Sequence, residues 1–174
     1  MYAVPLHRLL PPFLTLPLPT PGSFGGTDGR YHYNDTWAFD FSTKTWSELP
    51  CTGYIPCPRE GHAAALVDDI MYIFGGRSVD GANIGQLAAF KISTRRWFMF
   101  QKMGPEPSPR SGHGMAAVGS KVYVLGGVCE DGLNGNRKDA NVVYILETST
   151  LFLARCPGIT PRRHLIVVSR HVWI

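Results

Sequence analysis

The sequence predicts an all-β fold built from repeated units of about 50 residues, and two repeated motifs and a set of short apolar runs support that prediction. Gly-Gly pairs occur at 25–26, 75–76 and 126–127, so they are 50 and 51 residues apart. A Pro-Arg-x-Gly-His segment at 58–62 returns at 109–113, again 51 residues later. Two independent motifs therefore keep nearly the same period.

A third repeated segment and the apolar runs define the elements within each unit. Residues 39–46 match residues 90–97, again 51 positions apart, and both segments end in Trp. The runs at 70–74 and 122–125 are β-branched and aromatic, which predicts strands that end at the glycine pairs.

The remaining strands follow in chain order. Residues 36–41 predict the next strand, Ser42-Thr43 its turn, and Trp46 opens a last strand that ends at Pro50. Small residues at 61–67 begin a new unit, and Asp68-Asp69 is typical of a turn. Four short antiparallel strands in about 50 residues correspond to one blade of a β-propeller.

These residues resemble the kelch repeat, in which a Gly-Gly pair follows an apolar strand and a Trp follows at a fixed spacing. The resemblance covers residues 25–154 and implies four-stranded blades around a central channel. We therefore expect an incomplete kelch-type β-propeller, because about two full blades cannot close a ring of roughly 4–8 blades. The chain is thus predicted to be a fragment of a larger propeller.

The predicted domain organisation has three parts. Residues 1–24 form a Pro-rich irregular leader, and residues 25–154 hold a partial blade at 25–50 and blades at 57–103 and 108–154. The partial blade is expected to supply only its last two strands, because a Pro-rich segment stands where the strand before Gly25 should be. Residues 155–174 are either a basic tail or a truncated fourth repeat.

A narrower resemblance points to fungal kelch cell-end markers, which help fix the axis of polarised growth. It is carried by residues 86–90, 93–97, 100–105, 110–115 and 142–150. It implies an interaction scaffold for cell polarity or cytoskeletal organisation, located in the cytoplasm at the cell cortex or tip. It also implies that the full-length protein oligomerises through regions outside this sequence.

The repeated polar and aromatic residues are predicted to be structural, because equivalent residues occupy the same place on different blades instead of converging on one site. The histidines show no metal-ligand spacing, and no phosphate-binding loop motif occurs. The chain is therefore predicted not to be an enzyme, with no catalytic, cofactor or metal residues. The predicted anchors are Gly25, Gly26, Trp46, Arg59, Gly61, His62, Gly75, Gly76, Trp97, Arg110, Gly112, His113, Gly126 and Gly127.

One loop is a candidate for binding other proteins. Residues 128–139 are polar, Gly-rich and longer than the equivalent loop of the preceding unit, and loops on a rigid scaffold often carry binding residues. The charged candidates there are Glu130, Asp131, Arg137 and Lys138. An insertion without a role is the equally weighted alternative.

Charge and cysteine content exclude several classes of function. The net charge is +4, but residues 25–154 carry 12 Lys and Arg against 13 Asp and Glu, so the excess lies in the flanks. Nucleic-acid binding is not expected, because it requires cations clustered on one folded face. The four cysteines form no C-x-x-C pair and predict free thiols, and no apolar run reaches the length of a membrane span.

Two rival functions differ in the residues they need. A galactose-oxidase-like copper enzyme shares the kelch propeller, but its set of Tyr and His ligands and its Tyr–Cys cross-link cannot be matched to residues here. A substrate-receptor propeller of a ubiquitin ligase needs an adaptor domain that these 174 residues do not contain.

Overall fold

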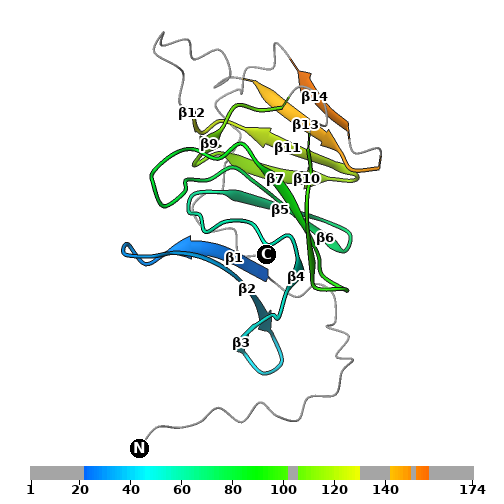
Figure 1. Ribbon diagram of the computed structural model, residues 1–174. Coiled ribbons are helices and arrows are strands. Elements are labelled where there is room, and N and C mark those ends of the chain that lie inside the picture. The colour runs from blue at the N-terminus through cyan, green and yellow to red at the C-terminus, as the bar shows by residue number, and fades with distance from the viewer. Residues whose placement is uncertain (1–21, 102–105, 130–141, 150–151, 157–174) are drawn as a thin grey trace, which may run out of the picture.

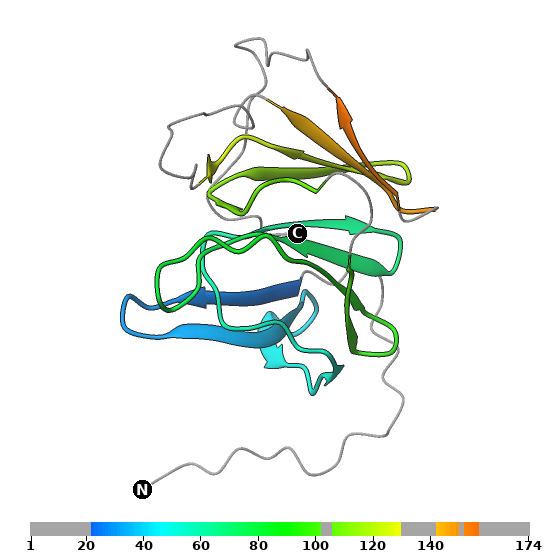
Figure 2. The same cartoon turned by 45° about the horizontal axis from the view of Figure 1, so that its top comes forward.

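The computed structural model describes residues 22–101, 106–129, 142–149 and 152–156, and within these residues every regular element is a β-strand. Three sheets are stacked in layers along the chain (Figures 1 and 2). This arrangement confirms the prediction of an all-β fold and an incomplete propeller. We name the three sheets blade 1, blade 2 and blade 3.

Each blade is antiparallel, with its strands in chain order. Blade 1 contains β1 (Gly22–Thr27), β2 (His32–Asp40) and β3 (Thr45–Glu48). Blade 2 contains β5 (Ala63–Val67), β6 (Ile70–Phe74), β7 (Leu87–Lys91) and β8 (Arg96–Met99). Blade 3 contains β10 (Gly114–Val118), β11 (Lys121–Leu125), β13 (Val143–Glu147) and β14 (Phe152–Cys156).

One short pairing connects two blades, and a second lies within blade 3. The dipeptide β4 (Thr52–Gly53) follows blade 1 and pairs in parallel with β8 at the outer edge of blade 2. The strand β9 (Arg110–Ser111) precedes blade 3 and pairs with β12 (Val128–Cys129), which follows its second strand. Neither pairing was predicted, because two-residue strands carry no readable alternation.

The first blade differs from its prediction. It was expected to supply only its last two strands, but β1 is a third strand that pairs with β2 from Gly22↔Ala38 to Thr27↔His32. The prediction, like the bound of the predicted leader at residue 24, was wrong because it counted residues 22–24 with the Pro-rich segment, whereas they begin β1. Phe24 in this strand is 5% exposed and packs on Trp97 of blade 2, with ring centroids 4.7 Å apart. Contact with the next blade thus stabilises β1.

The alternation of side chains along each strand distributes the core between two interfaces. On β6, Met71 and Ile73 face blade 1, whereas Tyr72 and Phe74 face blade 3. The blade 1–blade 2 interface also contains Phe24, Phe90 and Trp97. The blade 2–blade 3 interface is formed by Ala65, Val67, Leu87, Ala89, Val122, Val124, Val142, Tyr144 and Leu146. Blade 2 is therefore apolar on both faces because it has a neighbour on each side.

Candidate functional site

The two Pro-Arg-x-Gly-His segments, which we call the opening segments, each bury an arginine completely. Arg59 Nη1 donates to the carbonyl of Gly75 (3.1 Å), and Nε donates to the carbonyl of Cys57 (3.2 Å). Its Nη2 donates to Gln86 Oε1 at 2.7 Å. Burial lowers the pKa of Arg59, but its guanidinium stays charged because its ordinary pKa lies so high. Arg59 therefore ties its opening segment to the end of β6.

Arg110 makes the equivalent bonds one blade later. Its Nη1 donates to the carbonyl of Gly126 (2.8 Å), and its Nε donates to the carbonyl of Ser108 (3.1 Å). The guanidinium carbon lies 5.5 Å from the ring centroid of Tyr144, a cation–π contact. Because all these partners belong to the scaffold, neither arginine is available to an acidic ligand.

The opening segments also join neighbouring blades through the backbone. The amide of Gly26 donates to the carbonyl of Arg59 (2.9 Å), and the amide of Gly76 donates to the carbonyl of Arg110 (2.8 Å). In return, the amide of Arg59 donates to the carbonyl of Tyr33 at 3.2 Å. The first two Gly-Gly pairs are thus bound to the opening segment of the next blade.

The glycines are required where backbone from another segment approaches. Gly75 has φ +69°, and a Cβ there would lie 2.5 Å from the carbonyl oxygen of Arg110. At Gly76 (φ +98°) a Cβ would lie 2.8 Å from the carbonyl oxygen of Glu60 in its own blade. The first glycine therefore faces the next opening segment, and the second faces its own.

The histidines of the opening segments lie at the same blade–blade seams. His62 packs edge-on against Phe24 (centroids 5.6 Å apart), and His113 packs against Phe74 (5.5 Å). Burial is the main cause that lowers the pKa of each to about 4, and the adjacent arginine cation lowers it further. Both imidazoles are therefore neutral at pH 7 and serve as packing residues.

The other predicted anchors have different exposures. Trp97 is 1% exposed in the blade 1–blade 2 interface, whereas its repeat-equivalent Trp46 is 37% exposed. Gly61 and Gly112 are exposed with φ near +60°, and the amide of Gly112 donates to the carbonyl of Gly61 (2.8 Å). Gly25, Gly26, Gly126 and Gly127 all have positive φ at the ends of β1 and β11.

The described residues hold no group of three His, Cys, Asp or Glu side chains that could bind a metal ion. Cys51, Cys57 and Cys129 are free thiols. The part of the chain that the structure describes also contains no helix able to span a bilayer.

Four exposed apolar side chains lie at one edge of the blades, on or beside the β1–β2 loop, the β6–β7 loop and β12. We call this surface the loop face, and it lies along one side of the stacked sheets (Figure 1). Its exposed members are Tyr31 (67%), Tyr33 (40%), Val79 (71%) and Val128 (64%), with the charged side chains of Arg30 and Arg77 beside them. Of these residues only Val128 lies in the loop at 128–139 that the sequence singled out; Tyr31 and Tyr33, close together after the first Gly-Gly pair, could have been noticed as aromatic residues near a turn.

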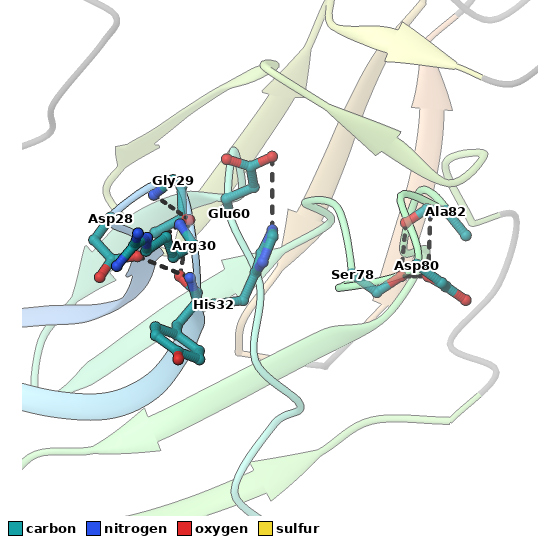
Figure 3. A network of polar contacts seen from close by, with 10 residues as sticks. Asp28, Gly29, Arg30, His32, Glu60, Ser78, Asp80 and Ala82 are labelled. Atoms are coloured by element: carbon teal, nitrogen blue, oxygen red, sulfur yellow. Dashed lines mark hydrogen bonds and ion pairs between the residues drawn. The ribbon is translucent and has the colours of Figure 1, made fainter.

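Polar contacts hold the loops of this face in place. Asp28 Oδ1 accepts from the amides of Arg30 and Tyr31 (both 2.8 Å), and these bonds lower the pKa of the Asp28 carboxyl. The hydroxyl of Ser78 and the amide of Ala82 donate to Asp80 Oδ1, and these bonds lower the pKa of the Asp80 carboxyl. Figure 3 shows both turns, with His32 directed toward Glu60; His32 Nε2 lies 3.6 Å from Glu60 Oε1.

Hydrogen bonds then link the loop that carries Arg77 to the opening segment of its own blade and to β12 of blade 3. Glu60 and Arg77 exchange two amide–carbonyl bonds of 3.0 and 2.7 Å, and Asn83 Nδ2 donates to the carbonyl of Val128 (3.3 Å). The loop face is therefore a connected surface, fixed by the scaffold beneath it. Among the described residues no ion pair is formed by the side chain of Arg30 or Arg77. The predicted partner-binding residues Glu130, Asp131, Arg137 and Lys138 lie outside the described residues.

Stacked four-stranded blades with a fixed loop face define a repeat protein of the β-propeller class. The chain belongs to the kelch-repeat family: residues 23–127 match the KLHDC2/KLHL20/DRC7 Kelch-repeats domain, and residues 109–150 match the Kelch motif.

Several curated proteins are similar to this chain. The bovine (Bos taurus) Rab9 effector protein with kelch motifs is 36% identical over 122 residues, which cover 67% of this chain and 33% of that protein. Acyl-CoA-binding domain-containing protein 5 of Arabidopsis thaliana is 34% identical over 130 residues, 74% of this chain and 19% of that protein. The leucine-zipper-like transcriptional regulator 1 homolog of Drosophila melanogaster is 33% identical over 110 residues, 60% of this chain and 11% of that protein. The chain thus spans a third or less of the length of these relatives.

Proposed function

We propose that this chain is a protein-interaction module that binds a partner protein through its loop face. One observation carries the proposal: exposed tyrosine and valine side chains stand on or beside loops that hydrogen bonds tie to the opening segments and, through Asn83, to the next blade. Tyr and Arg are enriched where binding energy concentrates at protein interfaces, and a fixed surface loses little conformational entropy when it binds.

The charge of the loop face favours a protein over a polyanion. Asp28, Glu60 and Asp80 stand beside Arg30 and Arg77, so the described charges are mixed instead of uniformly basic. Asp28 and Asp80 bond to their own turns, which leaves the guanidinium groups of Arg30 and Arg77 to pair with carboxylates of a partner. Mixed polar groups around exposed apolar side chains are typical of a protein interface.

The relatives suggest a first partner to test. Because one relative is named a Rab9 effector protein, purified Rab9 is the first candidate partner to test. Proteins that the chain captures from a cell lysate are the further candidates. Proteins captured from the lysate are identified and purified. The binding of each purified candidate to the chain is then measured by calorimetry. The narrower role in cell polarity or cytoskeletal organisation rests on the resemblance to cell-end markers alone.

A pair of matched variants tests the location of the site. Val79→Asp places a charge on the loop face, whereas Val118→Asp places the same charge on β10, and the two valines are 71% and 65% exposed. With a reconstituted partner, we expect Val79→Asp and Tyr31→Ala each to raise Kd by at least about tenfold, a typical effect at an interface anchor. Val118→Asp should leave Kd unchanged. Equal loss in both Asp variants, or loss in neither, would contradict the proposal.

A further inference from the structure

The sheet of blade 2 has a fifth strand at its outer edge. The strand order is β4-β8-β7-β6-β5, so β4 is the last strand on that side. The amides of Thr52 and Tyr54 donate to the carbonyls of Arg95 (3.0 Å) and Trp97 (3.1 Å). Because bonds to one neighbour alternate along a strand, the amide and carbonyl of Gly53 are directed away from β8. Among the described residues no backbone bond reaches Gly53, so β4 has an open edge.

Exposed apolar side chains stand along this edge. Tyr54 is 54% exposed, and Ile55, which follows it, is 41% exposed. The bond between Tyr54 and Trp97 places Tyr54 opposite Phe98 of β8, which is 41% exposed as well. The guanidinium carbon of Arg96 lies 5.6 Å from the centroid of the Phe98 ring, a cation–π contact. The edge thus combines two exposed aromatic rings with a cation.

A second cation lies opposite Arg96. Lys91 of β7 pairs with Arg96 in register, and both side chains are exposed. Among the described residues neither forms an ion pair, and the carboxylate of Asp69 in the turn between β5 and β6 bonds to Ser93 instead. Like charges directly opposite each other destabilise an antiparallel pair, so a bound anion would relieve this repulsion. We call the surface of residues 52–55, Lys91, Arg96 and Phe98 the outer-edge patch.

The propeller repeat does not require these residues. The other two blades have an acidic residue at the register position of Lys91, namely Asp40 in blade 1 and Glu147 in blade 3. They have small residues at the position of Phe98, namely Ser47 and Ala154. Exposed arginine and aromatic side chains that the repeat does not need are typical of an interface with another molecule.

We propose that the outer-edge patch binds an extended acidic segment of a partner protein, at a site separate from the loop face. The segment lies beside β4 and pairs with the amide and carbonyl of Gly53, a mode in which backbone bonds provide affinity. Its carboxylates pair with Lys91 and Arg96, and one of its apolar or aromatic side chains packs on Tyr54 and Phe98. Single-stranded nucleic acid also stacks on aromatic side chains, but only a polypeptide pairs with both backbone groups of a strand edge.

Three pools of fluorescein-labelled peptides, each of about a dozen residues, test the nature of the bound segment. The first pool has a central tyrosine flanked by Asp and Glu at random among Gly and Ser. The second has Lys and Arg in place of the acids, and the third has serine in place of the tyrosine. In fluorescence anisotropy the first pool should bind the 174-residue chain at least about tenfold more tightly than either of the others. Equal binding of all three pools, or binding of none, would overturn the proposal.

Two substitutions taken from the repeat itself test the location. Arg96→Thr and Phe98→Ser introduce the residues that blade 1 has at the same register positions, Thr45 and Ser47. Each should weaken binding of the acidic tyrosine pool at least about tenfold, with circular dichroism unchanged. Tyr31→Ala, on the loop face, is the control and should leave this binding unchanged. If neither substitution weakens binding, or if Tyr31→Ala weakens it equally, the outer-edge patch is not the site.

Methylation of the peptide backbone tests the strand pairing. In a ladder only alternate amides of the bound segment face its neighbour. In the tightest peptide of the acidic pool, N-methylation of one alternate set of amides should abolish binding, whereas methylation of the other set should be tolerated. Equal effects of the two sets would show that the segment does not pair with β4.

A fluorescein-labelled thymidine oligonucleotide tests the other class of ligand. We expect it to bind more weakly than the acidic peptides, and its binding should not depend on Phe98. Tighter binding than the peptides, lost in both Arg96→Thr and Phe98→Ser, would assign the outer-edge patch to single-stranded nucleic acid and overturn the proposal.

Discussion

Blade 1 and blade 2 carry the same aromatic pair at the same register, but only one of the pairs is buried. Phe90 and Trp97 lie 2% and 1% exposed against blade 1, whereas Trp46 of blade 1 is 37% exposed. Their geometry within each blade is nearly equal, with ring centroids 5.0 and 5.2 Å apart. Trp97 also donates to Thr36 across the interface. A repeat motif thus fixes where a side chain stands in its blade, and the neighbouring blade determines whether it is buried.

The largest expected loss of stability comes from truncating Trp97, the tryptophan of the buried pair. Trp97→Ala should lower the free energy of unfolding by about 3–5 kcal/mol, the usual cost of truncating a large buried aromatic residue. Trp46→Ala should lower it by less than about 1 kcal/mol, as expected at an exposed site. Both are measured by denaturant unfolding of the 174-residue chain. Equal costs at the two positions would mean that the blade 1–blade 2 interface does not bury Trp97.

The second prediction concerns the effect of pH on the blade–blade interfaces that contain His62 and His113. The pKa values of His62 and His113 are lowered to about 4 in the folded chain, whereas an unfolded histidine has its ordinary value of 6.5. As pH falls below 6.5, the unfolded chain binds protons that the folded chain does not, so the free energy of unfolding should fall by a few kcal/mol between pH 7.5 and 4.5.

A substitution of one histidine tests whether these two residues cause the pH dependence. His113→Gln should roughly halve the loss of stability between pH 7.5 and 4.5, whatever its stability at pH 7.5. The comparison stops at pH 4.5 because the lowered pKa values of Asp28, Asp40 and Asp80 place the titration of these carboxyls at lower pH. A stability that stays constant across this range would rule out buried neutral histidines.

The smallest expected effect is the difference in stability between alanine substitutions at two equivalent glycines, Gly75 and Gly126. Gly75 and Gly126 have nearly the same φ, +69° and +71°, so alanine brings similar backbone strain to both. Among the described residues, only at Gly75 would the added Cβ also meet backbone, 2.5 Å from the carbonyl oxygen of Arg110. Gly75→Ala should therefore cost at least about 1 kcal/mol more than Gly126→Ala in thermal or denaturant unfolding. Equal costs would show that contact with the next opening segment is not what requires glycine.

The regular strands could be predicted because they depend on local pattern. The run at 70–74 coincides with β6, and the strand predicted at 122–125 lies within β11 (Lys121–Leu125). Alternating burial along such runs follows from the pleat of a strand, which every strand shares. The glycine pairs at the ends of those strands were recognisable for the same reason, since positive φ favours glycine wherever it occurs.

What the sequence by itself determined about this protein is thus its period, its strands and its family of fold. Only the tertiary structure decided the exposure of Trp46, the third strand of blade 1 and the loop face of Tyr31, Tyr33, Val79 and Val128. Burial is a property of two surfaces in contact, and the second surface lies one repeat away in the sequence. Equivalent residues such as Trp46 and Trp97 therefore share a motif and differ in environment.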